Sequence, residues 1–422
     1  MPTSLKELYD SLRMSQGGRA VSSSDDPLVL QLSQLVLSHG LQSRASDIHI
    51  EPTLSGARIR YRIDGILHEV LQVPQEIRDP LIRSIKVKAN MATENIGRSK
   101  PQDSRIDFEV DGQKIDLRLS SFPTLFGDVL AMRLLSHTAA PLTFDQIGFA
   151  PETLAQFERL IRRPNGFILV TGPTNTGKTT TLYAAIHRLR SPHTKIITLE
   201  DPVEYQLDGV IQGQINPTIG LTFSSGLRAI LRQDANVILV GEIRDTETVD
   251  VAIRAALTGH LVFSTMHTRH SLGAITRLLD MKIEPHLIVA SVTGIVAQRL
   301  VRVLCPQCQA ADSIAASAFT RLWTQETGAA PAAESLSRLR KGVGCPACNA
   351  TGYQGRVGIF ELLVLTDAVK RAILNQPAGG LYQAVVASGG LQTMLLDGLR
   401  KAAQGQTSVD EVLRVTGETE GL

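Results

Sequence analysis

The sequence predicts an α/β protein with more than one domain, and two patterns support this fold class. Beyond residue 165, short apolar segments alternate with helical patterns, which is typical of a parallel sheet with helices on both faces. Between residues 47 and 119, apolar residues alternate with polar ones, which is typical of strands that bury one face. The length of 422 residues corresponds to two or three domains at about 150 residues each.

The first part of the chain is expected to be a small α+β domain. Residues 1–27 have turn and linker composition and are expected to be loosely ordered. Pro27 then begins a helical pattern, and Asp64-Gly65 and Asp111-Gly112 are signals for tight hairpins. The chain is therefore divided into six regions: a flexible N-terminus (1–27), an α+β domain (28–135), a linker (136–150), an α/β core (151–304), a cysteine-containing region (305–360) and a C-terminal helical region (361–422).

The composition argues against several functional classes. Lys and Arg total 43 and Asp and Glu total 41, so the formal net charge is only +2, whereas bulk binding to nucleic acid or anionic membranes favours a strongly basic surface. Aromatic residues make up 4% of the chain, which disfavours a base-stacking platform, and we expect no nucleic-acid partner. No apolar run reaches the ~18 residues of a membrane span, and charged residues between Met1 and Asp10 argue against a signal peptide. We therefore expect a cytoplasmic protein.

A glycine-rich motif between a predicted strand and a predicted helix indicates a nucleotide site. The motif Gly172-Pro173-Thr174-Asn175-Thr176-Gly177-Lys178-Thr179, followed by Thr180, fits the phosphate-binding pattern G-x-x-x-x-G-K-[ST]. Backbone N–H groups of such a loop surround the β-phosphate of ATP, and the positive end of the helix adds to the attraction. Lys178 is expected to hold phosphate oxygens and the Thr179 hydroxyl to bind Mg²⁺. A glycine-rich turn without function is the alternative, which the flanking strand and helix disfavour.

Acidic residues follow two further apolar strands. Glu200, Asp201 and Glu204 come after one strand, and Glu242 comes after the strand 237–240. Because the carboxyl ends of parallel strands line the ligand crevice, these carboxylates are expected near Mg²⁺ and the attacking water. The alternative is that they are solvated acids in the first turn of the next helix. For Glu200 and Asp201 the two interpretations are equally supported.

Two histidines flank a third strand, Leu261 to Ser264. His267 follows the carboxyl end of this strand, so it is expected to reach a γ-phosphate or a neighbouring subunit. His260 precedes the strand. A histidine with a purely structural role is the alternative for both residues, and it is better supported for His260.

Four cysteines form two C-x-x-C pairs, Cys305 with Cys308 and Cys345 with Cys348. Two close pairs of thiolates are what a tetrahedral Zn²⁺ site requires, so we expect a structural zinc ion bound by all four. Disulfide bonds are disfavoured in a cytoplasmic protein, and a redox dithiol needs only one such pair. Thiols without a metal are the remaining alternative. The zinc ion would pin residues 309–344 to the core and take no part in the chemistry.

These motifs and a further N-terminal stretch resemble the secretion ATPases of the type II secretion and type IV pilus assembly class. The stretch Ser46-Asp47-Ile48-His49-Ile50-Glu51-Pro52, followed by Arg60-Tyr61-Arg62-Ile63-Asp64-Gly65, is similar to the N-terminal-domain signature of this family. The stretch from Leu199 to Glu204 resembles its Asp box, Leu231 to Asp234 with Val240 to Asp245 its Walker B region, and Thr258 to His267 its His box. The resemblance covers nearly the whole chain from about residue 40.

The resemblance implies an architecture and roles for several residues. It implies a PAS-like N-terminal domain, a RecA-like P-loop ATPase domain with a zinc-binding insertion and C-terminal helices, and assembly into a ring-shaped homohexamer. Glu242 would be the general base that activates water, assisted by Glu204. Arg105 and Arg118 would reach the γ-phosphate from the N-terminal domain, which agrees with the stabilisation of transition-state charge by arginine. Surface ion pairs are the alternative for both arginines.

The chain departs from the family pattern at three points. Ser104 stands where the family usually has Gly, and Arg269-His270 follows His267-Thr268 where the family often has Asn-Asp. Longer relatives carry an additional N-terminal domain that docks to a membrane complex, and we expect this chain to lack it.

The resemblance also implies a function and partners. We expect an ATPase that powers type II secretion through pseudopilus assembly, acting on an inner-membrane platform protein and associating peripherally with the inner face of the cytoplasmic membrane through its partners. A type IV pilus assembly ATPase is the main alternative, and the tetracysteine motif favours assembly over pilus retraction. A RecA-like nucleic-acid translocase is less well supported because the charge is balanced and aromatic residues are scarce. A nucleotide-binding switch without turnover is a third class.

Overall fold

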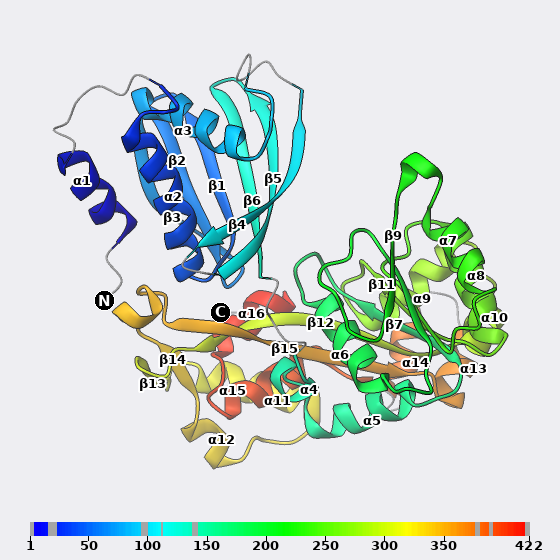
Figure 1. Ribbon diagram of the computed structural model, residues 1–422. Helices are drawn as coiled ribbons and strands as arrows, with labels where there is room; N and C mark the ends of the chain where they lie inside the picture. Colours follow the sequence, from blue (N-terminus) through cyan, green and yellow to red (C-terminus); the bar gives the residue numbers. More distant parts are fainter. Residues whose placement is uncertain are drawn as a thin grey trace. The chain divides into compact units, whose positions relative to one another are not determined.

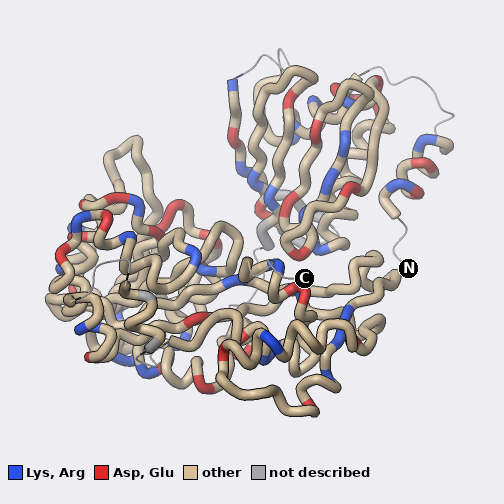
Figure 2. Tube along the Cα trace, turned by 180° about the vertical axis from the view of Figure 1, so that it is seen from behind, with Lys and Arg blue, Asp and Glu red and all other residues tan. Residues whose placement is uncertain are grey.

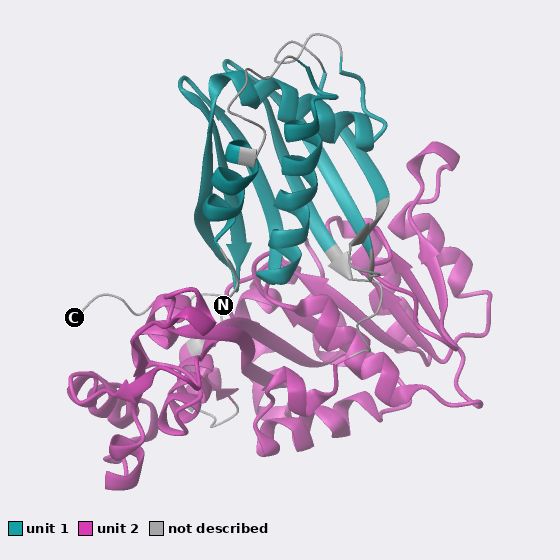
Figure 3. Ribbon diagram, turned by 60° about the vertical axis from the view of Figure 1, so that its left-hand side comes forward, with its two compact units in different colours: residues 1–140 teal, residues 141–422 magenta. Residues whose placement is uncertain are grey.

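The computed structural model describes residues 4–15, 23–93, 100–110, 113–136, 142–375, 380–387 and 391–417, which fall into two compact units (Figure 3). Unit 1 comprises residues 1–140 and unit 2 residues 141–422. Each unit has its own sheet (Figure 1), and each has its own hydrophobic core. The predicted α/β fold class, with a smaller α+β part at the N-terminus, is confirmed.

Unit 1 is built on a six-stranded antiparallel sheet in the order β3-β2-β1-β6-β5-β4. The Asp64-Gly65 hairpin forms as predicted, with φ values of 48° and 87° that suit a two-residue turn. The predicted turn at Asp111-Gly112 lies outside the described residues, and the strands on either side of it pair antiparallel. The strands are β1 (Ala45–Thr53), β2 (Gly56–Ile63), β3 (Ile66–Pro74), β4 (Gln102–Val110), β5 (Gln113–Thr124) and β6 (Gly127–Ser136).

Three helices pack on this sheet: α1 (Leu5–Ser15), α2 (Pro27–Gln42) and α3 (Gln75–Lys88). The period-two pattern of the strands explains the packing, because Ile48, Ile50, Ile59 and Tyr61 point to one face and are all fully buried. The Tyr61 hydroxyl donates a hydrogen bond of 2.7 Å to the carbonyl oxygen of Val36 in α2. Apolar contact and a buried hydrogen bond therefore both fix α2 to the sheet.

The N-terminal segment is more ordered than its composition indicates. Turn and linker composition predicts loose order for residues 1–27, but Leu5–Ser15 form α1. The reason is packing, since Leu5 and Tyr9 are buried in the core of unit 1. The prediction of a flexible N-terminus is therefore wrong for α1, while residues 16–22 lie outside the described residues.

Unit 2 contains an eight-stranded sheet in the order β16-β15-β12-β7-β11-β10-β8-β9. The strands from β12 to β9 in this order run parallel, whereas β15 and β16 are antiparallel to their neighbours. The predicted parallel sheet is thus present. The strands of this sheet are β7 (Gly166–Thr171), β8 (Ile196–Glu200), β9 (Ile211–Gln214), β10 (Val237–Val240), β11 (Leu261–Met266), β12 (Val292–Leu304), β15 (Tyr353–Val364) and β16 (Leu391–Gln392).

Helices cover both faces of the parallel sheet. In β7, Phe167 and Leu169 belong to one core cluster, and Ile168 and Val170 belong to another. All four side chains are fully buried, as expected for a parallel sheet between two helical layers. The helices of unit 2 are α4 (Phe144–Ile147), α5 (Pro151–Ile161), α6 (Lys178–Leu189), α7 (Phe223–Ile230), α8 (Thr246–Leu257), α9 (Ser271–Asp280), α10 (Pro285–Ser291), α11 (Ala316–Thr327), α12 (Ala333–Ser337), α13 (Asp367–Asn375), α14 (Leu381–Ala387), α15 (Met394–Ala403) and α16 (Val409–Thr416), with the 3₁₀ helices η1 (Pro217–Ile219) and η2 (Pro346–Cys348).

Two predicted boundaries differ from the structure. A linker is predicted over residues 136–150, but Phe144 and Phe149 are buried in unit 2, and the Phe149 ring stacks on Phe360. Residues 137–141 lie outside the described residues. The predicted boundary at residue 360 falls inside β15, which pairs with β12. The cysteine region, with the small strands β13 (Gln309–Ala311) and β14 (Arg340–Gly342), is therefore an excursion between two strands of the main sheet.

The charged residues and the helices agree with the near-neutral composition. Lys and Arg are interspersed with Asp and Glu in both units (Figure 2). None of the helices in the described ranges combines the length and the apolar character of a membrane-spanning segment.

A buried ion pair in unit 1 provides a test of its core. Lys86 of α3 and Asp128 of β6 are fully buried with charged atoms 2.5 Å apart. Removing one partner leaves an uncompensated buried charge, so we predict that Asp128→Ala lowers the free energy of unfolding by about 3–5 kcal/mol in urea denaturation. The control is Glu76→Ala, which removes an exposed pair with Arg13 and should change this free energy by less than ~1 kcal/mol. An equally small change for Asp128→Ala would contradict the prediction.

Candidate functional site

Four strands of unit 2 end at the same edge of the sheet, and each leads into a motif singled out in the sequence. The strands β7, β8, β10 and β11 are mutually parallel, so their carboxyl ends meet on one side. The glycine-rich loop follows β7, Glu200 ends β8, Glu242 follows β10, and His267 follows β11. The fold therefore gathers at one edge residues that are far apart in the sequence.

The loop between β7 and α6 has the backbone geometry of a phosphate cradle. Asn175 and Gly177 have φ values of 61° and 83°, in the left-handed region that Asn and Gly tolerate best. Gly172 leaves no room for a side chain, because a Cβ atom there would lie 2.7 Å from the carbonyl oxygen of Gln298. Helix α6 begins with Lys178 directly after the loop, and N–H groups in the first turn of a helix have no partner within the helix. These groups are available to an anion.

Lys178 is folded back onto the loop. Its Nζ atom donates to the carbonyl oxygen of Gly172 at 2.9 Å and to that of Pro173 at 2.8 Å. Burial lowers the pKa of Lys178 to about 8, against the opposing effect of the Glu242 carboxylate. Phosphate oxygens carry negative charge, so they are stronger partners for this ammonium group than the two neutral carbonyl oxygens.

Glu242 and His267 lie together near this lysine. Glu242 Oε2 is 3.5 Å from His267 Nε2, and the Arg244 guanidinium donates to the other carboxylate oxygen. The side chain of Glu242 is 18% exposed and that of His267 is 47% exposed, so the carboxylate is largely enclosed but still reaches solvent. The structure thus brings these two predicted site residues to the phosphate-loop edge. Their chemical roles remain predictions.

Threonine hydroxyls connect the strand ends at this edge. Thr171 Oγ1 accepts a hydrogen bond of 2.9 Å from the Thr268 N–H, which joins the end of β7 to the segment after β11. Thr265 donates to the Gly241 carbonyl oxygen at 2.8 Å, which joins β11 to the segment that carries Glu242. Hydrogen bonds of this kind rigidify a buried polar region, so the loop and Glu242 are held at a fixed spacing.

Glu200 is buried and hydrogen-bonded, which differs from the predicted alternative of a solvated acid. Its side chain is buried, and its carboxylate accepts hydrogen bonds from Tyr183, from Thr198 at 2.6 Å and from Gln212 at 3.2 Å. Burial, together with the Glu200 charge, raises the pKa of the Tyr183 phenol. Glu200 is therefore a buried acceptor that ties α6 and β9 to β8, and the helix-start interpretation is wrong for this residue.

Glu204 lies in the loop between β8 and β9, at the carboxyl edge. Glutamines of β9 hold this loop on both sides of it: the Val203 N–H donates to Gln214 at 3.2 Å, and the Leu207 N–H donates to Gln212 at 2.7 Å. Glu204 is half-buried, and Asp201 at the start of the loop is exposed. The role of Glu204 near Mg²⁺ and water stays a prediction.

His260 lies at the other end of β11. Its Nδ1 atom is 3.1 Å from the carbonyl oxygen of Ala255 in α8. His260 is thus separated from the carboxyl edge by the length of the strand, and the structural interpretation applies to it.

The predicted arginines Arg105 and Arg118 lie in unit 1, opposite each other on adjacent strands. Arg105 of β4 pairs in register with Arg118 of β5, which pairs in turn with Arg133 of β6. Residues directly opposite in antiparallel strands share a face of the sheet, so these three form a row. Asp116 accepts a hydrogen bond of 2.9 Å from Arg105, and Asp47 lies 3.3 Å from Arg133. Arg133 was not predicted from the sequence, although Arg118 and Arg133 are equally distant from the β5–β6 turn.

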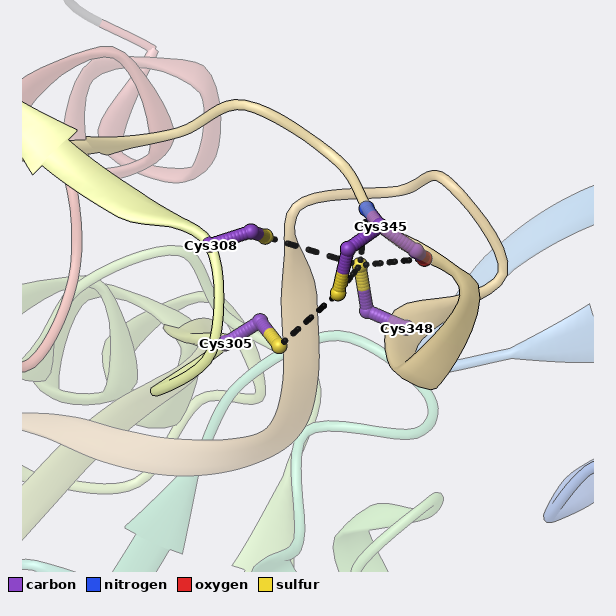
Figure 4. Close-up of side chains that lie close together, drawn as sticks. All are labelled: Cys305, Cys308, Cys345 and Cys348. Carbon is purple, nitrogen blue, oxygen red and sulfur yellow. Dashed lines mark hydrogen bonds between the residues drawn. The ribbon is translucent and has the colours of Figure 1, made fainter. Parts of the chain in front are cut away.

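The four cysteines converge between the end of β12 and the segment before β15 (Figure 4). Their Sγ atoms all lie within 4.8 Å of one another. Cys305 is 3.9 Å from Cys345, and Cys348 is 3.8 Å from Cys308 and 3.7 Å from Cys345. Four sulfur ligands at about 2.3 Å from a tetrahedral zinc ion would lie ~3.8 Å apart, so the residues fit zinc. A disulfide bond requires about 2.05 Å between sulfur atoms.

Backbone N–H groups point at one of these sulfur atoms. The amides of Cys345 and Gly352 each donate to Cys348 Sγ at 3.2 Å. Burial raises the pKa of the Cys348 thiol, but these amides and the neighbouring thiols outweigh it and lower this pKa to about 6. The thiolate is the form that binds a metal, so the backbone favours the metal-binding form of Cys348, whereas burial and the neighbouring thiols raise the pKa of the Cys308 thiol to about 11.

The RecA-like sheet, the glycine-rich loop after β7 and the acids after its neighbours define a P-loop nucleoside triphosphatase. A sequence profile described as "Type II/IV secretion system protein" matches residues 22–414. The chain therefore belongs to this family.

Several curated relatives cover most of the chain. It is 42% identical over 407 residues to "Type II secretion system ATPase E" of Vibrio cholerae, covering 96% of this chain and 79% of that protein. It is 43% identical to "Type II secretion system protein E" of Dickeya dadantii, covering 99% and 80%. "Type IV pilus assembly ATPase PilB" of Myxococcus xanthus is 41% identical and covers 92% of this chain, which matches 68% of that protein.

Solved structures agree on the fold. The pilus retraction motor PilT with bound ADP superposes with a TM-score of 0.60 at 26% identity and covers 92% of this chain and 98% of that chain. The Legionella pneumophila ATPase DotB superposes with a TM-score of 0.68 over 95% of this chain and 100% of that chain, at 20% identity. Both similarities extend over residues of both units and support the fold of each.

The lowered pKa of Lys178 predicts a pH dependence of nucleotide binding. The ammonium form binds phosphate, and half of it is lost at about pH 8 in the nucleotide-free chain. We therefore predict that ADP affinity falls as pH rises, by up to about tenfold per unit above pH 8, in titrations with a fluorescent ADP. Lys178→Met should bind weakly with little pH dependence. A wild-type affinity that is constant between about pH 7.5 and 9.5 would contradict this assignment.

The sulfur spacing predicts one zinc ion per purified chain, measured by mass spectrometry of the metal content. Cys348→Ser should contain almost none and should melt several degrees lower, because the metal no longer joins β12 to the segment before β15. Gln307→Ala lies in the same turn as Cys305 and Cys308 and serves as the control, with zinc retained. A wild-type protein without zinc, whose melting temperature does not respond to a chelator, would count against the site.

Proposed function

We propose that this chain hydrolyses ATP and that the hydrolysis powers type II protein secretion through assembly of a pseudopilus. The proposal rests on one observation: the phosphate loop, Glu242 and His267 lie at the same edge of a RecA-like sheet. The relatives named as type II secretion ATPases, which match most of the chain, support the biological role.

In the proposed site, the loop holds the phosphates of ATP. Backbone N–H groups between Gly172 and Thr180 bind the β-phosphate, and Lys178 exchanges its two carbonyl partners for β- and γ-phosphate oxygens. The Thr179 hydroxyl would hold Mg²⁺, which neutralises phosphate charge. Thr171 and Thr268 keep the start of the loop next to the segment after β11.

Glu242 is the proposed general base. Its position after β10 places a carboxylate near Lys178, and Arg244 and His267 fix its orientation. A carboxylate that takes a proton from the attacking water contributes about 10²–10⁴-fold to the rate. Glu204 is proposed to assist at the water, and His267 to respond to the γ-phosphate.

The arginine row of unit 1 is proposed to supply positive charge during hydrolysis. Arg118 lies between Arg105 and Arg133 in the row. Because these residues belong to a different unit from the loop, their delivery would depend on the arrangement of the two units, and an arginine delivered in this way makes hydrolysis depend on conformation.

The proposed assembly and location follow from the family. A homohexamer would act on an inner-membrane platform protein, with peripheral association at the cytoplasmic side of that membrane. The balanced charge argues against nucleic acid as the partner. Type IV pilus assembly is the second candidate, supported by the similarity to the Myxococcus xanthus ATPase, and it ranks lower because the relatives from Vibrio cholerae and Dickeya dadantii, which match at similar identity, are both named for type II secretion.

Glu242→Gln tests the proposed chemistry. We predict that kcat for ATP falls by about 10²–10⁴-fold in a phosphate-release assay, while the Kd for ADP stays within about threefold of the wild-type value. The matched control is Glu247→Gln, an exposed acid in the first turn of the following helix, which should leave kcat unchanged. In the bacterium that carries the gene, Glu242→Gln should stop protein secretion. Unchanged hydrolysis would contradict the catalytic assignment, and secretion lost only together with surface pili would favour the second candidate.

A further inference from the structure

Gln298 of β12 is a buried polar residue that touches the phosphate loop. Its side chain is 1% exposed. The Nε2 atom donates to the Thr176 carbonyl oxygen at 2.6 Å, and the Oε1 atom accepts from the Thr181 hydroxyl at 2.8 Å. Thr176 is in the loop and Thr181 is in α6, so one side chain connects β12 to both parts of the nucleotide motif.

The two partners fix the orientation of this amide. A carbonyl oxygen can only accept, so the NH₂ group of Gln298 must face Thr176. The oxygen of the amide then faces the hydroxyl of Thr181, which can donate. Each polar atom is satisfied in one orientation only, and burial makes the loss of either hydrogen bond costly.

The backbone around Gln298 also fits closely against the loop. A Cβ atom on Gly172 would lie 2.7 Å from the Gln298 carbonyl oxygen, and one on Gly177 would lie 3.2 Å from Gln298 Nε2. A side chain on either of the two glycines that frame the loop would thus crowd this residue. Arg299 donates to the Gln298 carbonyl oxygen at 3.0 Å and to that of Arg269 at 2.7 Å, so the contact surface is itself held in place.

The hydrogen bond to Thr176 sets the direction of the next N–H group. In a trans peptide the C=O of one residue and the N–H of the following residue point in opposite directions. When the Thr176 carbonyl points at the Gln298 side chain, the Gly177 N–H therefore points away from this side chain. Gly177 directly precedes α6, and N–H groups at this position bind phosphate.

From these contacts we infer that Gln298 is a positioning residue, which aims the Gly177 N–H at the β-phosphate by holding the Thr176 carbonyl. The inference rests on the proposed function, because it assumes that nucleotide binds in this loop. Gln298 itself does not touch the nucleotide. Its effect is on the affinity of the loop for both ATP and ADP, whereas Glu242 acts on the hydrolysis step.

The test measures nucleotide affinity and turnover separately in Gln298→Met, which keeps the length of the side chain and removes both hydrogen bonds. The Kd of fluorescent ADP and the KM for ATP should rise about tenfold or more, as expected for a lost hydrogen bond to a charged group. The kcat at saturating ATP should stay within about threefold. Thr181→Val, which leaves the glutamine in place but removes the partner of its oxygen, should change Kd and KM in the same direction by a smaller factor.

Thr293→Val is the matched control, because Thr293 also lies in β12 and donates to the carbonyl oxygen of Phe167 in β7 rather than to the loop. It should leave Kd, KM and kcat unchanged. An unchanged Kd in folded Gln298→Met, or a fall in kcat without a rise in Kd, would overturn the inference. If Gln298→Met does not fold, Thr181→Val decides by the same two measurements.

The two proposals fail in different ways. ADP binding is measured without turnover, so a wild-type chain that binds ADP but does not hydrolyse ATP contradicts the proposed function and leaves the role of Gln298 standing. A wild-type chain that binds no ADP contradicts both.

Discussion

The parallel order of the central strands of unit 2 is the constraint on which the candidate site depends. Because β8, β10, β11 and β7 all run in one direction, the residues that follow them share one edge of the sheet. A lysine after one strand and a carboxylate after another become neighbours although they are distant in sequence. On the other side of β7, the 13-residue β12 runs past the end of the six-residue β7. Gln298 is the first residue of β12 beyond the end of β7, and it contacts the phosphate loop. Cys305 directly follows the last residue of β12.

Features whose residues are close together in the sequence could be predicted. The phosphate loop is one, since its spacing and its flanking strand and helix are all local. The Asp64-Gly65 turn is another, because its φ values of 48° and 87° require residues of that kind. The cysteines are intermediate. Each pair is local, and the convergence of the two pairs was inferred from the preference of zinc for four ligands, which the sulfur spacing fits.

Features that depend on packing between distant segments could not be predicted. Gln298 carries no signal of its own, because its role exists only where β12 lies beside β7. Glu200 is the last residue of an apolar strand and Glu242 follows another, but hydrogen bonds from Tyr183 and Gln212 make Glu200 a buried acceptor. Helix α1 has linker-like flanks and is stabilised by burying Leu5 and Tyr9 against unit 1. In each case the structure or the role of the residue is set by contacts between distant segments, which the local sequence does not specify.

We conclude that this edge of the sheet binds the phosphates of a nucleotide through a loop whose conformation is fixed by hydrogen bonds to Gln298 of β12. The most direct test is an experimental structure of the full chain with ADP and Mg²⁺. We predict that Lys178 Nζ leaves the carbonyl oxygens of Gly172 and Pro173 for phosphate oxygens, while the hydrogen bond from Gln298 to Thr176 is kept. A nucleotide bound elsewhere, or a Lys178 that keeps both carbonyl partners beside bound phosphate, would contradict it.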